Sequence, residues 1–493
     1  EISACLVGSE MCIRDRLQLM LLSIMVMAQS QRTTHDLRGR VMCEGRGVPG
    51  VVVTDGVDCV LTDEDGVYWL EGKRDVRHVY LSTPAGYLTA CREKTIPQFY
   101  QSVDQTQPKE SYNFELIKNK QDDTKHIFTV QTDVQATSMD DIRGYADFLK
   151  DMNAYLADYR GKREMFSIDC GDIVGDSPHL FPAYIDTVSA LDLPIYRAIG
   201  NHDMTYGGRT FEYSYSKFEE LFGPIYYSFN KGKAHYIVID NCFYVNRNYQ
   251  YIGYVDERTF RWLEQDLSYV PDDYLVFLIA HIPSSLSKKL PYNSFTLDET
   301  TNITALYKLL RKYQAHFISG HTHSNLNICL SDSLMEHNTA AVCGTWWRAT
   351  ICMDGTPAGY GVYEVNGNQV RWAYKSVGYP IEHQFRVYPV GSSHEYPQDI
   401  IANVWNWDDQ WSVELWENGR SMGEMTHFTG YDPQAYAVCS DKERVLYDWI
   451  SPHKTSHLFR ATPQRAGSHL EVRVTDRFGR TYIQAVSYTH LRA

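Results

Sequence analysis

The 493-residue sequence has few of the features that mark a specialised class of protein. It contains no internal repeat, no low-complexity tract and no CxxC pair, which argues against zinc knuckles and thioredoxin-type chemistry. Its eleven cysteines are widely and irregularly spaced, so we expect most of them to be small buried hydrophobic side chains. Ordinary proportions of hydrophobic (43%) and charged (22%) residues exclude a disordered, collagenous or coiled-coil protein.

The sequence also lacks an excess of basic residues. Lys and Arg together number 47, against 61 Asp and Glu, which gives a net charge of −14. Sequence-independent binding to DNA or RNA depends on a broad field of positive charge. We therefore expect that nucleic-acid binding is not a primary role of this protein.

A hydrophobic run long enough to cross a membrane is missing as well. Residues 17–28 (LQLMLLSIMVMA) form a largely apolar run that is shorter than the roughly 20 residues a membrane span requires. Val26 and Ala28 fit the small residues of a cleavage site, so we interpret the run as the h-region of a signal peptide. The alternative is a buried N-terminal strand. We predict an exported protein, periplasmic or extracellular, without a transmembrane span.

Neither end of the chain behaves like part of a domain. Residues 1–16 (EISACLVGSEMCIRDR) and 486–493 (VSYTHLRA) resemble translated sequencing-adapter read-through. We exclude both segments as suspected artefacts from the expectations about the fold.

Short β-rich runs separated by turn residues occupy two regions of the chain. Residues 33–118 combine such runs with Gly-containing turns, and an aromatic strand follows the acidic turn 62–66. This pattern resembles the prealbumin-like or carboxypeptidase-regulatory-like β-sandwich. Residues 380–485 have hairpin patterns around Asn-Gly and Phe-Gly-Arg turns. We expect one β-sandwich domain in each region.

The middle region, residues 124–375, alternates strands and helices and predicts an α/β domain. Helical apolar spacing is present at 139–160, 211–223, 256–270 and 298–313. Between these helices lie short apolar strands, each of which ends in a polar cluster. Because α/β proteins place their chemistry at the carboxyl ends of buried strands, we expect these clusters to meet in one crevice.

The polar clusters follow one another in a fixed order along the chain. They are Asp133 with Gln135, Gly171-Asp172, Gly200-Asn201-His202-Asp203, His281, and Gly320-His321-Thr322-His323. Alone, each is more often a turn or an ordinary histidine than a ligand. Together they supply the carboxylate, amide and imidazole groups that a pair of divalent cations needs, with Asp172 as the natural bridge.

This ordered series resembles the calcineurin-like metallophosphoesterase superfamily over residues 124–330. The resemblance implies a four-layer α/β core, in which two mixed β-sheets are packed together and flanked by helices. It implies that one ion is held by Asp133, Asp172 and His323, with Gln135 where most members have His. It assigns to the second ion the side chains of Asp172, Asn201, His281 and His321. With its flanking modules, the chain is similar to a three-domain branch of secreted bacterial phosphoesterases.

The resemblance also implies the reaction. A metal-bridging hydroxide would attack phosphorus, and His202 would protonate the leaving oxygen or stabilise negative charge while Asp203 orients it. Asp176 is either a residue supporting the ligands or a solvated acid. The two ions are Mn, Fe, Mg or Zn, and the amide of Gln135 favours a Mn-type ion over Zn²⁺.

Five further residues are candidates for binding the substrate: Tyr206, Arg209, Trp346, Trp347 and Arg348. Arginine can pair with a phosphate through two hydrogen bonds, and tryptophan can stack on a ring. For each tryptophan, a place in the closing strand of the core is an equal alternative.

Three functions are compatible with this interpretation of the sequence. The first is dinuclear-metal hydrolysis of a small-molecule, sugar or lipid phosphate ester, either a monoester or a diester. The second is a cell-surface or glycan-binding protein with an inactive phosphoesterase scaffold, which the complete set of ligand types disfavours. The third is a protein phosphatase, which the export signal disfavours.

Overall fold

The computed structural model describes residues 35–486, except for Arg74, Gln105, Arg209, Arg247, Tyr249, residues 289–295, Leu446 and Ala466. The suspected artefact at 1–16 and the predicted signal-peptide segment 17–28 lie outside the described residues, as does the second suspected artefact apart from Val486. No helix in the described part of the chain has the length and apolar character needed to cross a bilayer. The nine described cysteines are unpaired and most of them are buried, as the sequence predicts.

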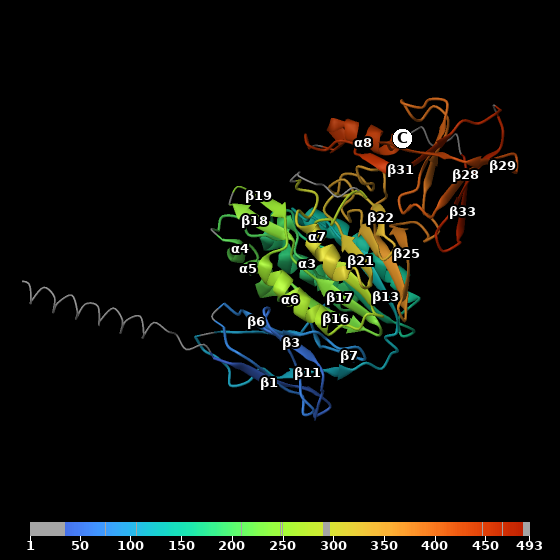
Figure 1. The fold of residues 1–493 in the computed structure, drawn as a ribbon. Coiled ribbons are helices and arrows are strands. Elements are labelled where there is room, and N and C mark those ends of the chain that lie inside the picture. Colours follow the sequence, from blue (N-terminus) through green and yellow to red (C-terminus); the bar gives the residue numbers. More distant parts are fainter. Residues whose placement is uncertain are drawn as a thin grey trace, which may run out of the picture.

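Small sheets make up the N-terminal region (Figure 1). The first contains β1 (Leu37–Cys43), β2 (Arg46–Gly47), β5 (Val67–Leu70) and β11 (Phe114–Glu115). The second has the order β10 (Tyr100–Ser102), β6 (His78–Leu81), β3 (Val52–Thr54), β4 (Cys59–Leu61). Two short pairs complete the region: β7 (Tyr87–Leu88) with β12 (Ile117–Lys118), and β8 (Cys91–Arg92) with β9 (Ile96–Pro97). The region contacts the core through Tyr226, whose hydroxyl donates to Gly56 O at 2.7 Å.

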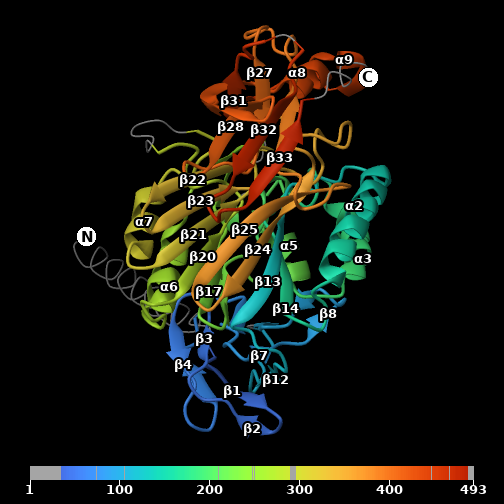
Figure 2. The same ribbon diagram turned by 90° about the vertical axis from the view of Figure 1, so that its right-hand side faces the viewer.

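Two mixed sheets form the middle of the molecule (Figure 2). One has the order β15 (Ile195–Arg197), β14 (Glu164–Asp169), β13 (Lys125–Gln131), β24 (Gly359–Asn366), β25 (Gln369–Ser376). The other has the order β16 (Tyr227–Lys231), β17 (Ala234–Val238), β20 (Leu275–Ile279), β21 (Gln314–Ser319), β23 (Leu334–Asn338), β22 (Leu326–Ser331). β13, β14 and β15 are parallel to one another, and so are β17, β20, β21 and β23.

Aromatic side chains hold the two sheets together. The ring of Phe128 on β13 meets those of Tyr236 and Phe277 edge to face, at centroid separations of 5.4 and 5.2 Å. All three residues are fully buried, and such edge-to-face pairs are more favourable than area burial alone. The interface between the sheets is therefore a tightly packed aromatic layer.

Helices cover the outer faces of both sheets (Figure 2). On one side lie α2 (Met139–Ala157) and α3 (Phe181–Val188), and on the other α6 (Glu257–Ser268) and α7 (Ile303–Leu310). Ser138 caps the N-terminus of α2, since its hydroxyl accepts a hydrogen bond from the backbone N–H of Asp141. The predicted α/β class, with two packed mixed sheets flanked by helices and with β-sandwich-like sheets in both end regions, is confirmed.

One predicted helix is divided. Residues 211–223 form α4 (Phe211–Ser214) and α5 (Ser216–Phe222), which meet at Tyr215. The Ser214 hydroxyl donates a hydrogen bond to Phe211 O, and the Ser216 hydroxyl donates one to Tyr213 O. Short polar side chains that bond to nearby backbone compete with a continuous helix, which explains the break.

The C-terminal region contains two four-stranded sheets. They are β26 (Arg386–Tyr388), β27 (Ile400–Asn403), β31 (Lys454–Ala461), β30 (Thr426–Tyr431), and β29 (Arg420–Glu424), β28 (Ser412–Glu417), β32 (Leu470–Thr475), β33 (Thr481–Ala485). The sequence patterns predict only strands here, but α8 (Pro433–Ser440) and α9 (Lys442–Val445) follow β30. Asp432 caps α8 by accepting from Ala435 N, and Pro433 occupies its first turn.

Buried polar contacts attach the C-terminal region to the core. Asn325 donates to Trp405 O at 2.8 Å, and Asn327 donates to Asn406 Oδ1 at 2.9 Å. His457 Nε2 lies 3.1 Å from Asp354 Oδ2. Because a buried polar group left unpaired is costly, these bonds fix the position of the C-terminal region next to β22 and the loops that follow β21 and β23.

Candidate metal centre

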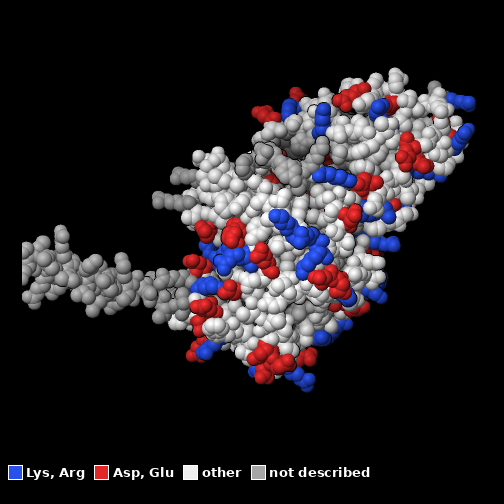
Figure 3. All heavy atoms as spheres, in the orientation of Figure 1, with Lys and Arg blue, Asp and Glu red and all other residues white. Residues whose placement is uncertain are grey.

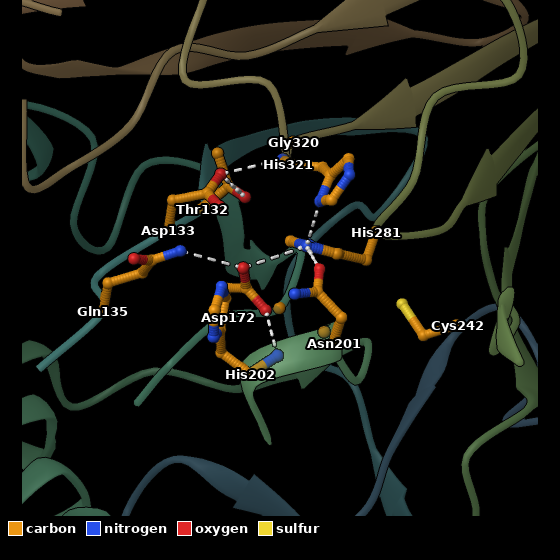
Figure 4. Close-up of polar contacts among 12 residues, drawn as sticks. Thr132, Asp133, Gln135, Asp172, Asn201, His202, Cys242, His281, Gly320 and His321 are labelled. Atoms are coloured by element: carbon orange, nitrogen blue, oxygen red, sulfur yellow. Dashed lines mark hydrogen bonds and ion pairs between the residues drawn. The ribbon is translucent and has the colours of Figure 1, made fainter. Parts of the chain in front are cut away.

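The seven side chains predicted as metal ligands come from the carboxyl ends of the parallel strands of both core sheets. Figure 4 shows all of them except His323 lying close together, and His323 Nε2 is 3.3 Å from Asp133 Oδ1. Asp133 and Gln135 follow β13, Asp172 follows β14, Asn201 follows β15, His281 follows β20, and His321 and His323 follow β21. Except for His321, which is half-buried, all of them are buried. The strands of the two sheets thus bring residues nearly 200 positions apart into one cluster.

Four of these side chains, Asp172, Asn201, His281 and His321, point atoms of the metal-ligand type at one another. His281 Nε2 lies 3.1 Å from Asn201 Oδ1, 3.2 Å from Asp172 Oδ2 and 3.2 Å from His321 Nδ1. The outer nitrogens of the two imidazoles are used elsewhere: His281 Nδ1 donates to Cys170 O and His321 Nε2 donates to Leu297 O. Without a cation, the Asp172 carboxylate outweighs burial and raises the pKa of His281 to about 9, so that His281 Nε2 holds a proton. A bound cation would take the place of that proton, and the inner nitrogens of His281 and His321 would then be its ligands.

Asp133, at the other side of Asp172, offers a second place for an ion. Its Oδ2 accepts from Thr132 Oγ1 at 2.7 Å and from the backbone N–H of His321 at 2.9 Å, which fixes the carboxylate. Its buried Oδ1 accepts no hydrogen bond from the described residues and lies 3.3 Å from His323 Nε2. An orphaned buried carboxylate oxygen beside an imidazole nitrogen fits a metal ligand pair.

Asp172 lies between the two groups of ligands. Its Oδ1 accepts from the backbone N–H of His202 at 2.8 Å, while its Oδ2 accepts from Gln135 Nε2 at 3.0 Å. Burial alone would raise the pKa of this carboxyl, but His281 and His202 hold it well below its usual range. Asp172 therefore stays ionised, as a carboxylate shared by two cations must.

Gln135 differs from the expectation of a simple oxygen ligand. Its Oε1 accepts a hydrogen bond from the indole Nε1 of Trp346 at 2.7 Å, while its Nε2 faces Asp172. Because an indole N–H can only donate, Trp346 keeps the amide oxygen on its own side. An ion beside Asp133 has to share the Gln135 oxygen with Trp346 or displace it.

Many residues around the centre have positive φ angles. Non-glycine residues with φ between 43° and 73° are Asp133, Gln135, Asp172, Asp176, His321, His323, Trp346 and Trp347. This conformation is unfavourable for residues with a Cβ and persists where the surrounding structure imposes it, which happens most often at functional sites. Gly200 and Gly320 add close approaches, since a Cβ there would collide with Asp172 and Thr132.

His202 lies at the rim of the centre and its ring is held by Asp176. The distance from His202 Nδ1 to Asp176 Oδ2 is 2.9 Å, and both side chains are about one third exposed. Burial lowers the pKa of His202, but the carboxylates of Asp172 and Asp176 outweigh this and raise it to about 9. In the absence of cations these carboxylates favour the protonated ring, which can donate a proton.

The prediction that Asp203 orients His202 is corrected by these contacts. The Asp203 carboxylate is buried and accepts from the backbone N–H groups of Val174 and Gly200, at 3.0 and 2.9 Å. It fixes the loop that carries Asn201, while Asp176 makes the contact to the ring. The short helical turn Asn201–Asp203 directs adjacent side chains to different sides, so neighbours in sequence do not share a partner.

The structure separates the predicted substrate-binding residues. Trp346 stacks over the ring of His323, with centroids 4.5 Å apart and planes inclined at 26°. Trp347 donates to Val134 O at 2.9 Å and packs against Gly144 of α2, which makes it a packing residue. Tyr206 donates to Asn201 O at 3.0 Å, and Arg348 is exposed and bonds to the Tyr447 hydroxyl at 3.3 Å. Arg209 lies outside the described residues.

Three family models match the chain and between them cover most of residues 35–482. "Calcineurin-like phosphoesterase" matches 126–325, "N terminal of Calcineurin-like phosphoesterase" matches 35–119, and "C terminal of Calcineurin-like phosphoesterase" matches 336–482. No curated protein matches the sequence.

Solved structures also resemble the chain. A dimetal phosphatase from Danio rerio is 14% identical and covers 51% of this chain and 96% of its own, with a TM-score of 0.36. A purple acid phosphatase from yellow lupin (Lupinus luteus) seeds is 13% identical and covers 66% of this chain and 67% of its own, with a TM-score of 0.39. A 5′-nucleotidase from Candida albicans is 13% identical and covers half of each chain, with a TM-score of 0.31.

The contact between His202 and Asp176 leads to a kinetic prediction. His202→Ala should retain the metals and lower kcat by about 10² to 10⁴, the usual range for a general acid. The loss should be smaller for an activated aryl ester than for an alkyl ester, and Asp176→Asn should show the same dependence with a smaller loss. Steady-state kinetics with both esters test this. Equal losses on the two esters would show that His202 is not the proton donor.

The hydrogen bond from Trp346 to Gln135 leads to a prediction about metal affinity. Trp346→Phe should tighten Mn²⁺ binding at the site beside Asp133 and His323 by about threefold to tenfold, because the amide oxygen of Gln135 is released for the ion. Gln135→His should tighten Zn²⁺ binding more than Mn²⁺ binding, because imidazole is the softer donor. Titration calorimetry of the metal-free protein measures both, with Trp347→Phe as the control. Unchanged affinities in both variants would mean that Gln135 contacts no ion.

Proposed function

Since the chain belongs to the calcineurin-like phosphoesterase superfamily, we propose that it hydrolyses a phosphate ester with the help of two divalent metal ions. The observation that carries this proposal is the position of Asp172 between two groups of acceptor atoms. One group contains Asn201, His281 and His321, and the other contains Asp133 and His323. Two ions that share one carboxylate are the arrangement for in-line displacement at phosphorus.

The ions and the residues that would hold them have separate roles in this proposed reaction. When bound, the ions polarise a phosphoryl oxygen and activate water for attack. The carboxylates of Asp133 and Asp172 offset the charge of the ions, and the imidazoles complete the ligand sets. The backbone N–H of His202 fixes one oxygen of Asp172 at 2.8 Å, so that the shared carboxylate keeps its orientation.

His202 is the proposed proton donor to the departing alcohol oxygen. Its ring is accessible at the rim of the centre, while its backbone is tied to Asp172 and its Nδ1 to Asp176. Because Nδ1 of His202 is bonded to Asp176, Nε2 of the same ring is the nitrogen available to the substrate. Donation from a positioned imidazolium avoids the release of an unprotonated alkoxide.

The proposed substrates are small phosphate esters, such as sugar, nucleotide or lipid headgroup phosphates. The ligand set of two carboxylates, two amides and three imidazoles suits Mn²⁺, Fe or Mg²⁺ better than Zn²⁺ at the Asp133 side, where only His323 supplies nitrogen. Figure 3 shows Lys and Arg interspersed with Asp and Glu over the visible face, without a broad basic area there. This mixture supports a small-molecule partner over a nucleic acid.

We further propose that the chain is an exported member of a secreted bacterial branch. The support is the apolar run at 17–28 and the pair of flanking β-rich regions around the core. A secreted enzyme would meet organic phosphates outside the cytoplasm, which agrees with a small-molecule substrate.

The role of Asp172 can be tested by one substitution. Asp172→Asn should lower hydrolysis by several orders of magnitude and reduce the content of both metals, because the shared charge holds both ions. Asp147→Asn on α2, which removes an exposed carboxylate paired with Lys150, is the matched control and should behave like the wild type. Metal analysis and hydrolysis of a chromogenic ester measure the effect. Activity within tenfold of the wild type with full metal content would contradict the two-metal assignment.

A further inference from the structure

A series of aromatic rings runs from the metal centre to the surface of the C-terminal region. Trp346 stacks on the predicted ligand His323, with centroids 4.5 Å apart. The ring of Trp449 meets Trp346 at 6.5 Å, with the planes nearly perpendicular at 84°. Tyr447 stacks on Trp449 at 4.5 Å and 24°. We call Trp346, Trp449 and Tyr447 the aromatic series.

Trp449 is exposed to an unusual degree. Its relative exposure is 63%, the highest among the large hydrophobic residues of the described chain. Trp346 and Tyr447 pack against the buried cluster around α8, which includes Val438 and Val445. Those two rings contribute to the packing of this cluster, whereas most of the Trp449 indole is exposed to solvent. A large exposed aromatic surface next to a catalytic centre is typical of a ligand-binding site.

The two rings that contact Trp449 are themselves held in place. Trp346 has a φ of 43°, and its indole N–H is fixed by Gln135 at 2.7 Å. At the outer end, the Arg348 guanidinium donates to the Tyr447 hydroxyl at 3.3 Å and lies 5.5 Å from the centre of that ring. Because both of its neighbours are fixed, Trp449 has fewer conformations to lose when a ligand stacks on it, which favours binding.

Trp449 lies within the length of a small ligand from the predicted metal ligand His323. The separations of 4.5 and 6.5 Å place its ring within about 11 Å of the His323 ring. A phosphate held at the centre would therefore leave its alcohol portion within reach of Trp449. An indole face binds flat rings, either an aromatic base or the apolar face of a sugar.

We propose that Trp449, supported by Tyr447, is a stacking subsite for a ring in the alcohol portion of the phosphate ester. The inference rests on the proposed function and extends it, because it names the substrate class as ring-bearing phosphate esters. The ring is held by the C-terminal region while the phosphate is held by the core. Arg348, beside Tyr447, is positioned to contact polar substituents of the ring.

Two substrate pairs test the subsite. The discrimination ratio is kcat/KM for a ring-bearing ester divided by kcat/KM for glycerol 2-phosphate. One arm uses a nucleoside 5′-monophosphate and the other uses a hexose phosphate, so that the source of the ring is distinguished. Trp449→Ala should lower the ratio in at least one arm by about 5- to 100-fold, the usual range for one stacking contact, mainly through KM. Trp449→Phe should restore much of it.

Trp69→Ala is the matched control, since Trp69 is also exposed (56%) but lies on β5 of the N-terminal region. Its ratio should equal that of the wild type. An unchanged ratio for Trp449→Ala in both arms, with a correctly folded protein by circular dichroism, would overturn the subsite.

A binding measurement separates this inference from the proposed function. Calorimetry with a nucleoside monophosphate and with a hexose phosphate should show weaker binding to Trp449→Ala than to the wild type by at least fivefold in one arm. If the wild type hydrolyses no ester but this difference is present, the proposed function fails and the subsite stands. If hydrolysis is normal and binding is equal in both proteins, the subsite fails alone.

Discussion

The buried carboxylate of Asp172 is the interaction on which the arrangement of the centre depends. Each of its oxygens has a separate task, since Oδ1 accepts from the His202 backbone and Oδ2 contacts Gln135 and His281. These contacts connect loops that follow β13, β14, β15 and β20, which belong to both core sheets. A negative charge that is taken out of water needs opposite charge close by. The burial of the carboxylates thus favours positive charge at this position, which the surrounding imidazoles or bound cations can supply.

The backbone of the loops that carry these charged side chains adopts unfavourable conformations. Asp133, Asp172, His321 and His323 all have positive φ angles, which direct their side chains inward from loops that leave parallel strands. Packing between the two sheets, through rings such as Phe128 and Tyr236, provides the rigid base that holds these loops. Stability in the core therefore compensates for strain in the loops.

Much of the fold and of the centre could be predicted from the sequence, because both depend on local patterns. Apolar strands that end in Asp, Asn or His identify their own carboxyl ends, and parallel pairing then brings residues such as Asp172 and His281 together. The partner of His202 could not be assigned in this way, since Asp203 is adjacent in sequence but Asp176 makes the contact. The bond between Trp346 and Gln135 spans 211 positions and has no local signal. Trp449 likewise reaches the centre only through the attachment of the C-terminal region.

The central claim is that this chain binds two ions that share Asp172. Diffraction from crystals soaked in Mn²⁺, collected to give an anomalous difference map, tests it most directly. The account predicts two peaks about 3.5 to 4 Å apart, one beside His281 and His321 and the other beside Asp133 and His323, with Asp172 between them. A single peak at saturating Mn²⁺, or two peaks that do not share Asp172, would contradict it.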